Sequence, residues 1–382
     1  MIMTMLKGFT QPIERIHVYL MEVEALRAFS FGTWRNRQHV FICLESNAHQ
    51  GWGENIVSVN NPDVPIDSWL AVLAQLKGRS LEDALAMVRL NLGLWRDRLT
   101  EAIEMALFDL AGKLGRVSAL QLLGLHKTNP VAGAWVILSD DLAVVGSSIR
   151  HAIETRQAEV VKVKLFGDLD LDQSIIKLVR RYAPKENTFL LGDVNCGYCP
   201  KEFDVTIEEV EQAMHTLASV GLDACEDPGR LTIEGWVALQ AKCPELAIIP
   251  DYPLRPARLA NKTLCKGMGR FYNIHPGSMA SIIDAIELAG KVQSFGAGLM
   301  IGDDSLIGPG CTIWQQIAIG LGASWVEAVE KENDSDRYKE AIQSSATKQS
   351  GSFIELKPNN HGFGLILDLN MMEEIASKSI TI

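Results

Sequence analysis

Several features that would assign this sequence of 382 residues to a specialised class are missing. No apolar run reaches the length of a membrane span, and the start, MIMTMLKGFTQPIERI, lacks the basic n-region and long h-region of a signal peptide. Positive charge is in deficit, since 36 Lys and Arg face 47 Asp and Glu and leave a net charge of −11. That balance argues against nucleic acid or an anionic membrane surface as a partner. We therefore expect a cytoplasmic protein with neither kind of partner.

Cysteine is also sparse and unevenly placed. Seven cysteines, an odd number scattered through the chain, do not form a disulfide framework and indicate a reducing compartment. Cys196 and Cys199 make a single C-x-x-C, and no second such pair accompanies it. A redox or zinc role for this pair stays open beside an incidental place in a loop.

What is present is the composition of a globular protein with room for roughly two domains. Hydrophobic residues make up 47% and charged residues 22%. From residue 130 onward, short apolar segments alternate with helical patterns, and each segment has the length of a buried strand bounded by turn residues. This rhythm predicts a parallel β/α barrel with strands at 130–138, 160–165, 188–193, 222–226, 246–250, 271–274, 297–301 and 323–328.

Charged residues end successive strands of this pattern, where β/α barrels place their active sites. Lys162 and Lys164 are two positions apart, so both point to one side of their strand, the barrel interior. Asp193, Glu226 and Asp251 end the next three strands and would repel one another unless a cation held them together. Hard oxygen ligands suit Mg²⁺, and a lysine near another cation can have a lowered pKa and act as a base. Each charge alone could be an ordinary polar strand end, but all five in register predict a site.

Outside the barrel pattern, the apolar residues recur with the spacing of longer strands and of helices. Residues 13–56 alternate like a meander of strands, and 66–115 show helical periodicity, with Thr100 as the expected N-cap of the last segment. The strand-like tail after residue 351 has no barrel unit left to join, so we expect it to return to the meander. The stretch 29–38, FSFGTWRNRQ, interrupts the first strand pair. It is either a lid or an exposed hairpin tip.

A set of motifs together resembles the enolase superfamily, specifically the family of mandelate racemase and muconate lactonizing enzyme. The motifs are GWGE at 51–54, AIEMALFDLAGKLG…LQLLGL at 102–125, VKVK at 161–164, GDVN at 192–195, CEDP at 225–228 and GFGLILD at 362–368. The resemblance covers nearly the whole chain. It implies an α/β fold in which residues 129–345 form a modified (β/α)7β barrel, capped by an α+β domain built from residues 1–128 and the tail 346–382.

The resemblance also implies a chemistry, the removal of a proton α to a carboxylate to give an enediolate. One Mg²⁺ per subunit, replaceable by Mn²⁺, is implied on Asp193, Glu226 and Asp251, with the third aspartate closer to the muconate lactonizing side. Lys164 would be the base, and Lys162 would lower its pKa and help to hold the substrate carboxylate. A Lys or His base with Mg²⁺ is the known pattern of enolase-superfamily sites.

Further roles follow from the same resemblance. Asn195 would orient a metal ligand or a lysine. Substrate recognition would come from the capping loops, through Trp34, Arg35, Arg37 and Trp52. The partner would be a small carboxylate, and we expect a homo-oligomer.

One position departs from the family pattern. On the muconate lactonizing side the sixth barrel strand ends in a lysine followed by a Gly-Gly pair, whereas here His275 stands in the lysine's place and Met279-Ala280 where the glycines would be. The next strand ends in GDDS, with no histidine for a mandelate-type His–Asp pair. His275 is expected to face the metal opposite Lys164, as an acid or base with a pKa near neutral. A structural histidine bonded to a loop carbonyl is the alternative.

Three hypotheses about function remain. The first is a racemase or epimerase that uses Lys164 on one face of the substrate and His275 on the other. The second is a dehydratase acting on an acid sugar or hydroxy acid, in which protonated His275 assists a departing hydroxide. The third is a catalytically silent binding protein, which the intact lysines and carboxylates argue against.

Overall fold

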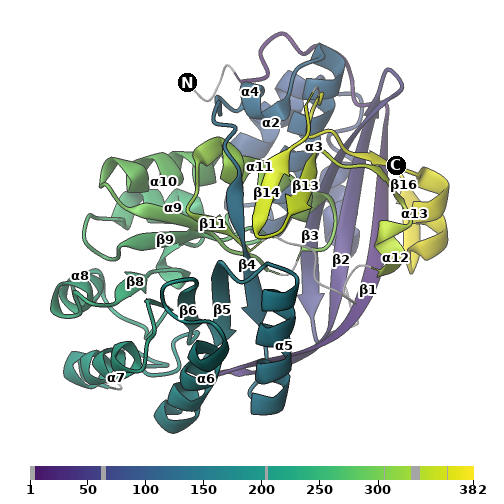
Figure 1. Ribbon diagram of the computed structural model, residues 1–382. Coiled ribbons are helices and arrows are strands. Elements are labelled where there is room, and N and C mark those ends of the chain that lie inside the picture. The colour runs from purple at the N-terminus through teal and green to yellow at the C-terminus, as the bar shows by residue number, and fades with distance from the viewer. Residues whose placement is uncertain (1–4, 62–65, 203–204, 305, 328–335, 359) are drawn as a thin grey trace.

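The computed structural model describes residues 5–61, 66–202, 205–304, 306–327, 336–358 and 360–382. A barrel lies beside a long antiparallel sheet, with helices of the N-terminal region over one end of both (Figure 1). Within these described ranges, no helix has both the length and the apolar character needed to cross a bilayer.

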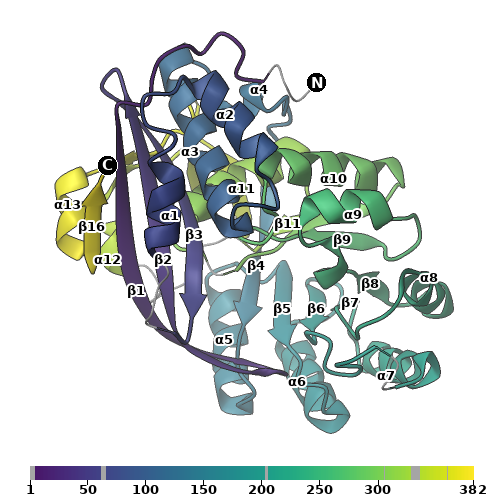
Figure 2. The same cartoon turned by 180° about the vertical axis from the view of Figure 1, so that it is seen from behind.

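The N-terminal region is built on a four-stranded antiparallel sheet in the order β16-β1-β2-β3. Its strands are β1 (Arg15–Phe29), β2 (Gly32–Ser46), β3 (His49–Val59) and β16 (Lys378–Thr381). The β1–β2 hairpin reaches across the barrel toward α6 (Figure 2). The expected interruption at 29–38 is therefore wrong, because β1 and β2 stay paired to Phe29 and Gly32, apart from a register shift between Glu24 and Arg27.

Four helices follow the sheet: α1 (Ile66–Leu73), α2 (Leu81–Leu90), α3 (Asp97–Gly115) and α4 (Ala119–Leu122). Helix α3 packs on β2 and β3 and is buried along nearly its whole length. The predicted N-cap at Thr100 is wrong, because the helix begins a turn earlier with Arg96 as its N-cap residue. Thr100 instead donates a hydrogen bond from Oγ1 to the carbonyl of Ala280 at 2.7 Å, so a contact with the barrel explains its polarity.

All eight predicted barrel strands are present and parallel, in the order β8-β7-β6-β5-β4-β11-β10-β9. They are β4 (Val131–Ile137), β5 (Val160–Lys164), β6 (Phe189–Asp193), β7 (Ala224–Glu226), β8 (Ala247–Ile249), β9 (Phe271–Ile274), β10 (Gly298–Ile301) and β11 (Trp325–Val326). Bonds from Arg270 N to Ile248 O and from Asn273 N to Pro250 O, both 3.1 Å, join the two end strands. The predicted last strand, 323–328, ends at Ala328, which lies outside the described residues.

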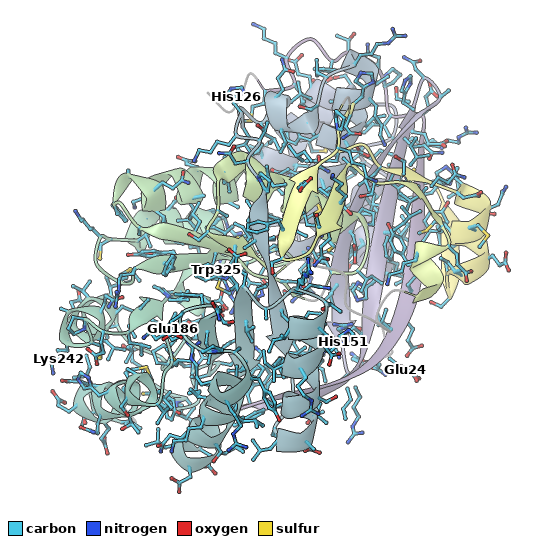
Figure 3. The ribbon with its side chains drawn as sticks, viewed as in Figure 1. Glu24, His126, His151, Glu186, Lys242 and Trp325 are labelled. Atoms are coloured by element: carbon cyan, nitrogen blue, oxygen red, sulfur yellow. The ribbon has the colours of Figure 1, made fainter. Side chains whose placement is uncertain are left out.

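The barrel helices lie outside the strands (Figure 1). They are α5 (Leu142–Glu154), α6 (Leu169–Tyr182), α7 (Ile207–Ser219), α8 (Ile233–Lys242), α9 (Ala257–Thr263), α10 (Ile282–Ser294) and α11 (Pro309–Leu321), with a short 3₁₀ turn, η2, at Tyr252–Leu254. Inside the barrel, Trp325 (Figure 3) packs against Phe189 and Phe271, with ring centroids 5.3 and 4.8 Å away. The interior is thus filled by side chains, as is usual for this architecture.

The tail divides between the two regions. It contains α12 (Asp336–Lys339), β12 (Ile342–Ser344), β13 (Thr347–Ser350), β14 (Phe353–Leu356), β15 (Ile366–Leu367) and α13 (Leu369–Ile375) before β16. The expected return to the meander is confirmed for β16, which pairs with β1. It is wrong for β14, which pairs antiparallel with β4 at the barrel, because the start of β4 has an edge free to accept another strand.

Buried carboxylates of the N-terminal region hold the barrel loops. Glu54 on β3 accepts the N–H groups of 307, 308 and 310 at the start of α11, at 2.7 to 3.1 Å. Glu101 on α3 accepts those of 277, 279 and 280 at 2.7 to 3.1 Å. Glu104 and Asp109 make similar contacts with 283 and 363. We call these four residues the junction carboxylates, and they lie within or beside the GWGE and EMALFDL motifs.

Candidate active site

The three predicted metal ligands end consecutive strands and are buried at one end of the barrel. Asp193 closes β6 and Glu226 closes β7, and the strand register sets them side by side. Asp251 follows β8 by two residues. Exposed fractions are 2% for Asp193, 0% for Glu226 and 1% for Asp251. Three carboxylates in so little solvent require compensating positive charge.

Two lysines on β5 supply part of that charge. Lys162 Nζ lies 2.6 Å from Glu226 Oε2, 3.2 Å from Asp193 Oδ2 and 2.9 Å from Glu327 Oε2. Lys164 Nζ bonds Asp193 Oδ2 and, at 2.9 Å, Asn195 Oδ1. Burial lowers the pKa of Lys162, but Asp193 and then Glu226 raise it well above its usual value. Lys162 is therefore a fixed ammonium held among carboxylates.

The same neighbours help to shift the pKa values of two carboxylates in opposite directions. Burial raises the pKa of Asp193, but Lys162 and Lys164 outweigh burial and hold the pKa far below its usual range. Burial, reinforced by the charge of Asp193, raises the pKa of Glu226 well above its usual range. Adjacent groups with pKa values driven apart are characteristic of functional sites.

His275, one residue past β9, is held at both ring nitrogens by carboxylates. Its Nδ1 lies 2.9 Å from Asp251 Oδ1, and its Nε2 lies 3.1 Å from Asp304 Oδ1. Burial lowers the pKa of the imidazole, but Asp251, with a further contribution from Asp304, raises it to about 10. The expected pKa near neutral is wrong for this structure, and the alternative of a bond to a loop carbonyl is not what the ring makes, since both its partners are carboxylates. Two carboxylates make His275 a cation.

Sequence reasoning missed four residues of this site. Asp304 and Glu327 each follow a barrel strand, and Asp304 belongs to the GDDS motif. Arg255 Nη2 bonds Asp251 Oδ2 at 2.6 Å. Asn273, fully buried on β9, donates from Nδ2 to Glu226 Oε1 at 2.7 Å and accepts the Gly302 N–H at 2.8 Å. A charged or amide residue at the end of each strand was the signal that could have found all but Arg255.

Asn273 and Asn195 both orient charged groups of the site. Asn273 fixes one oxygen of Glu226 and leaves the other beside Lys162. Asn195 donates its backbone N–H to Asp193 Oδ1 at 3.0 Å, and its side chain accepts from Lys164. These contacts agree with the predicted orienting role of Asn195.

The donor set suits a divalent metal. Among the described residues, one atom each of Glu226, Asp251 and His275 lie within 4.8 Å of one another. The two carboxylates can bind a metal, whereas His275, while it is protonated, cannot. Asp193 is outside this group because its carboxylate turns toward the two lysines. Lys162 Nζ nevertheless lies between Asp193 and Glu226. The space between these two carboxylates therefore holds a positive charge in this structure. Buried carboxylate oxygens at strand ends are the ligands that Mg²⁺ prefers.

A cavity of about 130 Å³ opens beside these groups. Its polar wall includes Lys162, Lys164, Asp193 and His275, and its apolar wall is provided by the β1–β2 hairpin and by β4. The aromatic residues of the hairpin stack on one another, with the rings of Phe29 and Phe31 5.0 Å apart and those of Phe29 and Trp34 4.8 Å apart.

The hairpin tip is attached to the barrel over this cavity. Lys164 Nζ lies 4.9 Å from the centre of the Phe29 ring. Ser30 Oγ donates to the Val194 carbonyl at 2.8 Å. The stretch 29–38 is thus the tip of a hairpin that covers the candidate base, and Trp34 lines the cavity there.

The other three predicted recognition residues do not line this cavity. Arg35 is exposed, and its backbone N–H bonds Asn60 Oδ1 at 2.7 Å. Arg37 is buried within the sheet at 1% exposure. Trp52 is fully buried against Tyr19, with ring centroids 6.1 Å apart. Strand alternation turns Arg37 inward, and Trp52 belongs to the core of the capping region.

The C-x-x-C pair lies in the loop after β6 as two buried free thiols. Burial raises the pKa of Cys196 well above its usual range, and Cys199 Sγ donates to the Lys201 carbonyl at 3.1 Å. A buried neutral thiol is a poor nucleophile and a poor metal ligand. Their contacts agree with the loop interpretation.

Comparison with known proteins gives consistent results, although no family model matches the chain. A hydrophobic dipeptide epimerase from Flavobacteria bacterium (strain MS024-2A) is 22% identical over 353 residues, covering 89% of this chain and 94% of the relative. A chloromuconate cycloisomerase from Pseudomonas sp. (strain P51) is 27% identical over 257 residues, covering 60% of this chain and 65% of the relative.

Solved structures share the fold over nearly the whole chain. A dipeptide epimerase from Cytophaga hutchinsonii, in complex with Mg and the dipeptide D-Ala-L-Val, has a TM-score of 0.79 at 18% identity and covers 97% of this chain and 100% of its own. An L-talarate/galactarate dehydratase from Salmonella typhimurium LT2 has a TM-score of 0.77 at 14% identity, covering 98% and 94%. The chain thus shares the fold of these enzymes, and its sequence relatives are an epimerase and a cycloisomerase at 22% and 27% identity.

Proposed function

We propose that this enzyme is a divalent-metal-dependent racemase or epimerase that moves the proton on the carbon next to a carboxylate. The observation that carries the proposal is that Lys164 and His275, which reach the barrel mouth from strands β5 and β9, line one cavity together with the buried carboxylate of Asp193. Inversion of a stereocentre requires two groups that can exchange a proton with the same carbon, one on each face.

The residues divide the work as follows. Lys164 takes the α-proton on one face of the substrate. His275, as the imidazolium, gives a proton to the same carbon on the other face. Lys162 holds the substrate carboxylate by charge, and the Phe29 ring keeps water from Lys164. Reversal of the reaction exchanges the roles of Lys164 and His275.

The metal would be held by Asp193, Glu226 and Asp251, with Mg²⁺ as the expected ion and Mn²⁺ as a substitute. When bound, it would stabilise the negative charge that develops on the substrate carboxylate as the α-proton leaves. Asn273 keeps one oxygen of Glu226 fixed, so less reorganisation is needed on binding. The Mg in the complex of the Cytophaga hutchinsonii epimerase supports a divalent metal in this enzyme.

A dehydratase is the second candidate, and one observation favours it. His275 has a pKa raised to about 10 by Asp251 and Asp304, so it is an acid at neutral pH. Elimination of a β-hydroxide needs such an acid near the leaving group. The likeness to the Salmonella typhimurium dehydratase agrees with this alternative.

The test is α-hydrogen exchange in D₂O, followed by ¹H NMR with Mg²⁺ present. Dipeptides, N-acylated amino acids and acid sugars would be offered as separate sets, and Lys164→Ala would be the control. The proposal expects exchange and inversion with at least one compound and no 2-keto product. A 2-keto product would establish the dehydratase instead. Absence of exchange throughout these sets would reject both enzymes in favour of a silent binding protein.

A further inference from the structure

A chain of polar contacts joins the N-terminal region to His275 through Asp304. Asp304, three residues past β10, is 7% exposed, so its charge needs fixed partners. Its two carboxylate oxygens face different neighbours. Oδ1 lies 3.1 Å from His275 Nε2, whereas Oδ2 accepts from Arg98 Nη2 at 2.8 Å and from Ser278 Oγ at 2.6 Å. One oxygen is thus held by the fold, and the other is directed at the imidazole.

Arg98 belongs to the N-terminal region and not to the barrel. It lies in the first turn of α3, and its backbone carbonyl accepts from Asn55 Nδ2 at 3.0 Å. Its guanidinium also donates to the Ile56 carbonyl at 3.3 Å. Both partners lie on β3, directly after the junction carboxylate Glu54. The strand that fastens the barrel loops therefore also fixes the arginine that holds Asp304.

Charge strengthens the contact between Arg98 and Asp304. Burial raises the pKa of Asp304, but Arg98 and then His275 outweigh burial and hold the pKa far below its usual range. Asp304 is therefore a carboxylate with positive charge on both sides, and hydrogen bonds between ionised groups are stronger than neutral ones. Without Arg98, Oδ2 would depend on Ser278, and the carboxylate would be free to turn about its side-chain bonds.

His275 has two carboxylate partners, and Asp304 is the one with no proposed place at the metal. The other partner, Asp251, lies 2.9 Å from Nδ1 and is a proposed metal ligand. Nε2 is close to Asp304 but makes no aligned hydrogen bond among the described residues. Asp304 therefore attracts the imidazolium by charge and leaves the proton on Nε2 uncommitted. Such a proton is available for transfer to a substrate.

We propose that Arg98 is a positioning residue for proton transfer by His275 and that it acts through Asp304. This inference rests on the proposed function, because it takes His275 to serve one face of the substrate. Lys164 reaches the mouth from β5, across the barrel from β9, and is held by Asp193 and Asn195. Loss of Arg98 should therefore slow the reaction of one enantiomer and spare that of the other.

The test uses Arg98→Met, which removes the guanidinium, in the whole protein with Mg²⁺ present. The first readout is ¹H–¹⁵N NMR of the His275 ring, assigned with His275→Asn, and it needs no substrate. The His275 signals are expected to shift, whereas those of His215 on the outer helix α7 should stay in place.

The second readout is the ratio of the α-hydrogen exchange rates of the two enantiomers of a compound that exchanges with the wild type. Arg98→Met should lower the rate for the enantiomer served by His275 at least about tenfold relative to the other, because misplacing a catalytic group by about 1 Å can cost about 100-fold. Both rates are measured on one preparation, so a lower folded fraction does not change the ratio.

Arg258→Met is the matched control. Arg258 on α9 pairs at 2.6 Å with Asp97, the neighbour of Arg98 in the chain, so this variant also removes an ion pair between α3 and the barrel. It should leave the His275 signals and the ratio unchanged. Arg98→Lys keeps a positive charge and should restore most of the ratio. If Arg98→Met does not fold, Ser278→Ala removes the other bond to the same oxygen and should change the ratio in the same direction.

Unchanged His275 signals in Arg98→Met, or an equal loss of exchange for both enantiomers, would overturn the proposal. A change of the same size in Arg258→Met would overturn it as well. Shifted His275 signals in a protein that exchanges no compound would support the positioning by Arg98 and reject the proposed reaction. Exchange with an unchanged ratio would support the reaction and reject the role of Arg98.

Discussion

Two sets of buried carboxylates in this molecule differ in what satisfies them. The junction carboxylates, such as Glu54 and Glu101, each accept three backbone N–H groups of the barrel loops. The mouth carboxylates, Asp193, Glu226 and Asp251, accept hydrogen bonds chiefly from side-chain cations. Lys162 contacts Glu226, and Arg255 contacts Asp251. Both sets are out of water, but the loop N–H groups that hold Glu54 and Glu101 are fixed by the fold, whereas the partners at the mouth are mainly side chains.

The difference separates structural acids from functional ones. A backbone N–H is fixed by the fold, so a carboxylate that accepts three of them fastens one domain to the other. A side-chain ammonium can withdraw by rotation and leave its carboxylate to a metal or a substrate. Burial alone therefore does not identify the active site, whereas the kind of partner does.

The largest expected effect comes from removing a mobile cation at the mouth. Lys164→Ala should lower turnover and α-hydrogen exchange by about 10⁴-fold, because the base is gone. Metal binding and folding should persist, since Lys162 still neutralises Asp193. Exchange by NMR and Mg²⁺ titration measure the two parts.

Lys113→Ala is the matched variant at the junction, where Lys113 Nζ bonds Asp109 Oδ2 at 2.8 Å. It should cost about 3 kcal/mol in the free energy of unfolding, since it leaves a buried charge unpaired. Activity per folded molecule should be unchanged. The distinction between the two sets fails if Lys164→Ala retains near wild-type exchange or if Lys113→Ala loses it.

Replacement of His275 tests which proton it moves. In His275→Asn a racemase should lose about 10³-fold in exchange of the enantiomer served by His275 and keep exchange of the enantiomer served by Lys164. A dehydratase should keep exchange and lose elimination. Chiral chromatography together with NMR reads both outcomes. Full activity in this variant would make His275 structural and leave Lys164 as the single base.

The smallest expected effect concerns the pH dependence of stability at the junction. Burial raises the pKa of Glu101 to about 7, whereas the backbone N–H groups oppose the rise. Between the unfolded pKa of about 4.5 and pH 7, the folded protein keeps a proton that the unfolded chain has lost. The free energy of unfolding should therefore fall as pH rises through this window, by about 3 kcal/mol from this group.

Glu101→Gln cannot titrate, so its free energy of unfolding should vary less with pH than that of the wild type. Urea unfolding at pH 5 and pH 8 measures the change for each protein. Parallel pH profiles would show that Glu101 does not carry the shift. The control is a Mg²⁺ titration of folded Glu101→Gln, whose metal affinity should equal that of the wild type.

The sequence predicted the barrel and the mouth residues because both depend on local order. Period and spacing place Lys162, Lys164 and the three acids at strand ends, and the structure brings them together. The predictions that failed concern contacts across the domain boundary. Thr100 matches an N-cap pattern in the sequence, whereas its partner, the Ala280 carbonyl, is 180 positions away. Trp52 matches a capping loop in the sequence, whereas its burial depends on β1.

His275 shows the same limit at the site itself. Its position was predicted, but its charge depends on contacts with Asp251 and, to a smaller degree, with Asp304, and the sequence links neither to it. The identity of the substrate, the cytoplasmic location and the homo-oligomeric state stay predictions.

The affinity for Mg²⁺ of Glu226→Gln, measured by calorimetry beside the wild type and Glu54→Gln, tests the central claim most directly. The claim is that the mouth carboxylates hold a metal and the junction carboxylates hold the fold. It predicts that Glu226→Gln loses at least about 100-fold in affinity, because a ligand charge is removed. Folded Glu54→Gln should bind Mg²⁺ like the wild type but unfold at lower urea. Wild-type affinity in Glu226→Gln would contradict the account.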